Sequence, residues 1–139
     1  MTETKGTRGT LVKMTDTALT VADPAADVRG RNVVDRHGDE IGSVDDLLID
    51  DQEQKVRFLQ VGAGGFLGIG EQHFLIPVDA ITKIDADHVH INRERTGLRS
   101  APTYDPELTY DYDYYGDVYG WWGYGPYWGP GYAYPRYPY

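Results

Sequence analysis

The residues best placed to do chemistry are the glycines of a loop at residues 62–70, whose spacing resembles that of a phosphate-binding loop. Gly65 and Gly70 match the two glycines of the nucleotide-binding pattern G-x-x-x-x-G-K-[ST]. That pattern continues with a lysine and the start of a helix, because a cation and free helix amides favour phosphate. Here Glu71 and Gln72 follow, and the next residues have the pattern of a strand. Since glutamate repels phosphate, the loop is interpreted as a connection between two strands.

Three apolar side chains lie within this loop, Phe66, Leu67 and Ile69. Glycine permits positive φ angles and close backbone approach, so the loop is expected to be tight. Two roles remain open for the apolar side chains. They either plug the core of their own domain or protrude as a contact surface for a partner.

Two other groups of side chains are candidates for metal binding. His88 and His90 leave the same face of an expected strand, while Val89 and Ile91 enter the core, but the sequence places no further ligands beside them. Acidic residues crowd one expected hairpin, namely Asp45, Asp46, Asp50, Asp51 and Glu53. This run lacks the glycine bend of a calcium loop, so a solvated acidic hairpin is expected. We therefore predict no metal site and no cofactor.

No set of side chains has the pattern of a catalytic centre. The chain contains no cysteine, which excludes disulfides, thiolate metal sites and a thiol nucleophile. Its serines, Ser43 and Ser100, lie outside any recognised nucleophile motif. We predict that the protein is not an enzyme.

Charge and hydropathy limit the kinds of binding partner and the cellular location that we expect for the protein. The formal net charge is −9, which argues against unaided nucleic-acid binding, because phosphate contacts require a basic surface. The N-terminus lacks the apolar core of a signal peptide, and no segment approaches the ~20 apolar residues of a membrane span. A cytoplasmic location is expected.

The middle of the chain has the pattern of short strands. Alternating apolar residues between turn signals predict six of them, at residues 29–35, 41–50, 55–62, 72–78, 81–84 and 88–92, and residues 93–100 are expected to form a short closing helix. Gly42 predicts a bulge or a close crossing, and Pro77 predicts the end of a strand. Without a long amphipathic helix to cover a sheet, these strands predict a small all-β barrel.

The chain divides into three parts. Residues 1–27 are read as an extension that is flexible or lies along the surface, with one helical turn near Pro24, and residues 28–100 as the barrel. Residues 101–139 form a tail that contains all 12 Tyr and all 3 Trp. Its glycines and prolines argue against regular structure, and its few aliphatic residues argue against a core.

The aromatic tail is nevertheless the strongest candidate for binding, since its apolar surface is large and aromatic pairs add contact energy. We select six side chains as a possible interaction surface, together with the three of the glycine loop: Tyr115, Tyr119, Trp121, Trp122, Tyr127 and Trp128. A second copy of the chain, a sugar surface or a proline-rich protein are candidate partners.

The order of several short motifs resembles the PRC-barrel domains, which occur in the H subunit of the photosynthetic reaction centre and in ribosomal RNA processing factors. The similar elements are Gly30, VVD at 33–35, Gly38, IG-x-V-x-DLLID at 41–50, V-x-FL-x-V at 56–61, GGFLGIG at 64–70 and FLIP at 74–77. The resemblance covers roughly residues 28–92 and is greatest to stand-alone bacterial members. It implies a six-stranded, SH3-like barrel that serves as an interaction or assembly module without catalysis of its own.

These observations together predict a non-catalytic barrel whose aromatic tail mediates self-association, as a homo-oligomer, or binding to another protein. A bacterial stress or envelope setting is expected. One alternative is a small-ligand or metal-binding barrel that uses Glu71, His73 or the two strand histidines. Another, by family analogy, is an accessory role in RNA processing.

Overall fold

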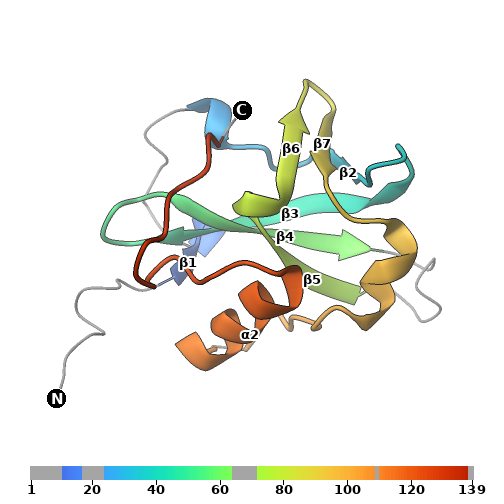
Figure 1. The fold of residues 1–139 in the computed structure, drawn as a ribbon. Helices are drawn as coiled ribbons and strands as arrows, with labels where there is room; N and C mark the ends of the chain where they lie inside the picture. Colours follow the sequence, from blue (N-terminus) through green and yellow to red (C-terminus); the bar gives the residue numbers. More distant parts are fainter. Residues whose placement is uncertain (1–10, 17–23, 64–71, 109, 138–139) are drawn as a thin grey trace, which may run out of the picture.

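A curled sheet centred on the long strand β3 (Glu40–Asp50) organises the protein (Figure 1). The computed structural model describes residues 11–16, 24–63, 72–108 and 110–137. On one edge β3 pairs with β4 (Val56–Ala63). Its other edge pairs with β2 (Asn32–Val34) near the start and with β1 (Leu11–Lys13) near the end, and all these pairs are antiparallel.

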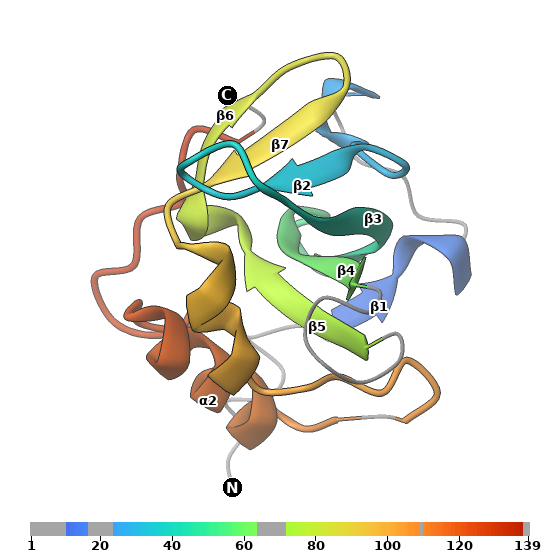
Figure 2. The ribbon, with the colours of Figure 1, turned by 90° about the vertical axis from the view of Figure 1, so that its right-hand side faces the viewer.

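The sheet continues outward from this centre in both directions. β5 (Gln72–Pro77) pairs with β4, and β2 pairs in parallel with β7 (His88–Ile91), which in turn pairs with β6 (Ile81–Ile84). The path therefore ends at β5 and β6, which the short 3-10 turn η3 (Val78–Ala80) connects. Figure 2 shows how far the sheet curls. The predicted all-β barrel architecture is confirmed.

Most of the expected elements are present, and the N-terminal part adds one. The described residues form seven strands rather than six, because β1 comes from the region read as an extension. A 3-10 turn forms at Pro24–Ala26, and the closing helix is the 3-10 segment η4 (Arg95–Ser100). Gly42 marks a close crossing, since a Cβ atom there would lie 2.1 Å from the carbonyl oxygen of Gly62.

Asp35 fixes the turn after β2 to the segment after β7. Its buried carboxylate accepts the backbone amides of His37 and Asp39, at 2.8 and 2.9 Å, through Oδ1. Oδ2 accepts the amide of Arg95 at 2.8 Å. Burial acts to raise the pKa of Asp35, but the three amide donors outweigh it and the pKa is lowered.

The C-terminal segment, by which we mean residues 101–137, contains an α-helix, α2 (Tyr112–Trp122). The expectation that this part lacks regular structure was wrong, because both ends of the helix are capped. The side chain of Asp111 accepts the amides of residues 113 and 114 at the N-terminus. At the other end Gly123 takes a φ of 91° and its amide bonds the carbonyl oxygens of residues 119 and 120. These caps offset the destabilising effect of the glycines inside the helix.

One face of α2 belongs to the hydrophobic core. Tyr115, Val118, Tyr119 and Trp122 are spaced i, i+3, i+4, i+7 and are buried. The rings of Tyr115 and Tyr119 pack against Phe58 of β4, and all eight residues of that strand are buried. The expectation that this segment cannot contribute to a core was therefore wrong, since tyrosine and tryptophan rings take the place of aliphatic side chains.

Candidate binding site

A buried ion pair lies where the C-terminal segment crosses the start of β4. Nε of Arg57 donates to Oδ2 of Asp50 at 2.8 Å, and the two side chains are only 5% and 1% exposed. Nη2 of Arg57 also donates to Glu53 at 2.9 Å. Burial acts to lower the pKa of Arg57, but the charge of Asp50 outweighs it and the pKa is raised. The expectation of a solvated acidic hairpin is corrected for Asp46 and Asp50, which are buried, whereas the other three acidic residues of that run are exposed.

A register shift between β3 and β4 aims this arginine at the aromatic segment. Leu48 opposes Phe58 and the next residue, Ile49, opposes Val56, so Arg57 is the extra residue of a β-bulge. Neighbouring residues of β4 consequently contact the same segment. The ring of Phe58 lies 4.8 Å from that of Tyr119, and the guanidinium of Arg57 lies 4.2 Å from the ring centre of Tyr127.

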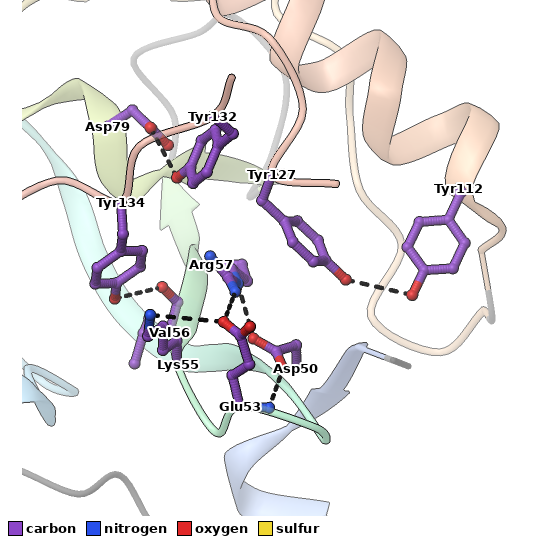
Figure 3. A network of polar contacts seen from close by, with 10 residues as sticks. All are labelled: Asp50, Glu53, Lys55, Val56, Arg57, Asp79, Tyr112, Tyr127, Tyr132 and Tyr134. Carbon is purple, nitrogen blue, oxygen red and sulfur yellow. Dashed lines mark hydrogen bonds and ion pairs between the residues drawn. The ribbon is translucent and has the colours of Figure 1, made fainter. Parts of the chain in front are cut away.

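Tyrosine hydroxyls fix the remainder of the segment to the barrel (Figure 3). Tyr134 donates to the carbonyl oxygen of Val56 at 2.9 Å, and Tyr132 donates to Oδ2 of Asp79 at 2.9 Å. Further along, the hydroxyl of Tyr137 donates to the carbonyl oxygen of Ala26. The segment thus runs from α2 along β4 and back to the 24–26 turn, as Figure 1 shows.

Between this segment and η3 lies a depression of about 350 Å³, which we call the Asp79 pocket. Its lining residues are Asp79, Tyr124, Gly125, Pro126, Gly129, Pro130, Gly131, Tyr132 and Ala133. Asp79 is the one carboxylate among them. Its Oδ1 is buried and has no hydrogen-bond partner among the described residues, while Oδ2 accepts from Tyr132. Burial raises the pKa of Asp79 against the opposing effect of the Tyr132 hydroxyl.

The barrel part of this arrangement matches a known family. The model of the PRC-barrel domain matches residues 22–96, more than half of the 139-residue chain.

The chain belongs to the PRC-barrel family.

Among curated proteins no significant match was found. The matched range contains Asp79 and every strand from β2 to β7, whereas α2 and the other lining residues of the Asp79 pocket lie beyond it. The pocket is therefore formed jointly by the PRC barrel and by a segment outside the family match. No helix in the described ranges is long and apolar enough to cross a membrane, and the cytoplasmic location stays a prediction.

The aromatic residues selected from the sequence divide into two groups on the PRC barrel. Tyr115, Tyr119 and Trp122 are only 7%, 0% and 4% exposed, so the prediction that they form a contact surface is corrected: their rings fill the core of their own chain. Trp121, Tyr127 and Trp128 are half-buried, and their role in binding stays a prediction. The selected loop residues Phe66, Leu67 and Ile69 lie outside the described residues.

The histidines lie beside carboxylates on the barrel surface. His88 and His90 share a face of β7, as predicted, and Asp85 contacts both, at 3.3 and 3.0 Å. His73 lies 3.4 Å from Asp45. Within the described part of the chain, no group of three or more histidine or acidic side chains is arranged to hold a metal ion. Glu71 lies outside that part.

The sequence does not indicate the pocket, because its lining joins residues that are distant along the chain. Asp79 precedes the tyrosines of the pocket by more than forty positions, and nothing in its local sequence, VDA, indicates a site. A detectable signal was the helical spacing of apolar residues at 115, 118, 119 and 122, followed by a glycine at 123. That pattern predicts a helix with a buried face and hence a segment packed against the barrel.

Proposed function

We propose that this PRC-barrel protein is a non-catalytic binding module and that the Asp79 pocket is part of the surface that contacts its partner. The observation that carries the proposal is the pocket itself. A volume of about 350 Å³ falls in the range of small-ligand and side-chain pockets. Rings and prolines supply apolar walls, and the half-buried carboxylate of Asp79 supplies a polar group in the lining.

The packing of the aromatic segment supports a defined binding surface over general adhesion. Among the described large hydrophobic residues only Leu108, at 55%, is exposed. Most rings of the segment contact one another or the barrel, so few of them are free to adhere to arbitrary surfaces. Binding is therefore assigned to the seam between barrel and segment, where shape and charge are fixed.

The partner is either another protein or a second copy of the chain. Among the other candidates from the sequence, a metal ion and RNA gain no support from the described residues: neither a ligand cluster nor a basic lining accompanies the pocket, and the net charge is −9. Both stay predictions.

A site-specific photocrosslinker tests the proposal. The full chain is prepared with a benzophenone amino acid in place of Tyr124, at the pocket rim, and a control carries it in place of the exposed Thr96. After irradiation in lysate of the source cells, we expect a discrete product from position 124 that position 96 does not give. A product of twice the chain mass identifies self-association, and a larger or smaller one a different protein. Equal smears from both positions, or no product, would refute the proposal.

A further inference from the structure

We infer that the Asp79 pocket binds an organic cation, a guanidinium or ammonium group carried by a basic side chain of the partner. The inference rests on the proposed function and specifies its chemistry. Three independent observations support it: the unbalanced carboxylate, the rings around it, and the use of the same chemistry elsewhere in the C-terminal segment.

The carboxylate of Asp79 differs from its neighbours in having no direct ion pair, because Arg57 acts on it only through its charge from a greater distance. Asp50 and Glu53 both pair with Arg57, whereas no described lysine, arginine or histidine forms an ion pair with Asp79. Tyr132 satisfies Oδ2, and Oδ1 is left buried without a donor. A desolvated carboxylate is costly unless a donor or cation joins it. A guanidinium or ammonium group supplies both the positive charge and the N–H donors.

Aromatic rings border the carboxylate. Tyr124 and Tyr132 both line the pocket, and a cation is attracted to the face of a tyrosine ring. The hydroxyl of Tyr124 accepts a hydrogen bond from Asn92 at 2.7 Å, which ties this ring to the end of β7. A pocket with one carboxylate and two fixed tyrosines suits a planar or compact cation and offers an anion no basic partner.

Cations of the chain itself already occupy comparable positions on the same segment. The guanidinium of Arg57 lies 4.2 Å from the ring centre of Tyr127, and that of Arg93 lies 4.6 Å from Trp121. The ammonium of Lys55 lies 5.0 Å from Tyr134. Aromatic rings of the C-terminal segment thus contact three cations of the chain itself. In the Asp79 pocket the rings and the carboxylate are present, and no described lysine, arginine or histidine lines it, so we assign the cation to another molecule.

The charge of the whole chain favours such a partner. At a net charge of −9, long-range attraction raises the encounter rate with basic segments and lowers it with acidic ones.

Calorimetric titration of the full chain with a blocked Gly-Arg-Gly peptide tests the inference, with Gly-citrulline-Gly as the uncharged analogue. We expect the arginine peptide to bind at least about tenfold more tightly than the citrulline peptide, because hydrogen bonds to a charged group are the stronger kind. D79N should weaken arginine binding about tenfold or more, while D117N, which removes the same charge from an exposed position of α2, should change it less than about twofold. Since a protonated carboxyl cannot pair with a cation, wild-type affinity should fall on acidification, and D79N should show a flatter profile.

Equal binding of the two peptides, or an unchanged affinity in a folded D79N, would overturn the inference. If D79N does not fold, amide chemical shifts of the wild type decide: arginine peptide must shift Gly129 and Gly131 of the pocket, and shifts confined to Asp85 or another acidic patch count against it. Argininamide separates the sources of the cation. Weaker binding than the peptide supports a partner side chain, whereas equal binding assigns the pocket to a free small molecule instead.

The failures of the two proposals are distinguishable. If position 124 crosslinks to a partner but the arginine and citrulline peptides bind equally, the proposal of a cation-binding pocket is refuted and the proposal of a binding module stands. If the arginine peptide binds but no crosslinked partner is found, the proposed partner surface is refuted and the preference of the pocket for a cation stands.

Discussion

Replacing Tyr119 by phenylalanine should make the protein more stable, although this side chain is the most completely enclosed aromatic of the C-terminal segment. Tyr119 is 0% exposed, and its ring packs 4.8 Å from that of Phe58. Its hydroxyl has no hydrogen-bond partner among the described residues. Y119F keeps the ring contacts and removes one desolvated polar group.

The size of the effect follows from the cost of that group. A buried donor or acceptor without a partner costs about 1–3 kcal/mol, so Y119F should raise the free energy of unfolding by up to that amount. Tyr137 provides the matched control, because it is also buried, at 8% exposure, but donates to the carbonyl oxygen of Ala26. Y137F leaves that oxygen unpaired and should lower the free energy of unfolding by about 1 kcal/mol or more.

Urea denaturation at pH 7, followed by tyrosine and tryptophan fluorescence, measures both variants. The same substitution should move the midpoint upward at position 119 and downward at position 137, with unchanged denaturant slopes. A loss of stability in Y119F equal to that in Y137F would refute the reasoning, since it would mean that the hydroxyl of Tyr119 is satisfied in solution.

Three further predictions concern the rest of the fold. G42A should lower the free energy of unfolding by roughly 1–3 kcal/mol, because its Cβ would meet the carbonyl oxygen of Gly62, whereas G97A, with open space around it, should change thermal stability little. Truncation after Ser100 should give an unfolded or aggregating chain by circular dichroism, since each buried side chain lost contributes about 1.5–3 kcal/mol against a total of only ~5–15; a folded monomer would contradict this. D35N should be less stable than wild type at pH 7 by about 1–3 kcal/mol. Because the folded-state pKa of Asp35 is lowered, that difference should shrink in urea titrations as the pH falls below about 4; a constant difference would exclude the carboxylate as its cause.

The barrel could be predicted because its residues alternate in a simple way. Val89 and Ile91 enter the core while His88 and His90 do not, which is the period of a strand with one solvated face. Gly42 and Pro77 fixed a crossing and a strand end through backbone geometry alone. Signals of this kind depend on the local sequence, so they can be recognised without knowledge of tertiary contacts.

The site could not be predicted, because it depends on what covers the sheet. In β4 both Arg57 and Phe58 are buried, although alternation assigns them to opposite faces. The bulge that brings both toward the C-terminal segment leaves no trace in the local sequence. The composition of the C-terminal segment does not indicate its packing, because a tyrosine suits a surface as well as a core: the hydroxyl of a buried tyrosine can be satisfied by a backbone oxygen, as at Tyr134 and Val56.

The hydrogen bond from Tyr137 to Ala26 joins residues 111 positions apart, and this separation bears on how the chain folds as it is synthesised. Contacts between distant residues slow folding, because a long loop must close before they form. The strands up to residue 91 are complete while residues 92–137 are still being added, which takes roughly 2–10 s at ~5–20 residues per second. During that interval the face of β4 that the segment later covers is open to solvent. The nascent chain should therefore depend most on chaperones shortly before its aromatic residues emerge.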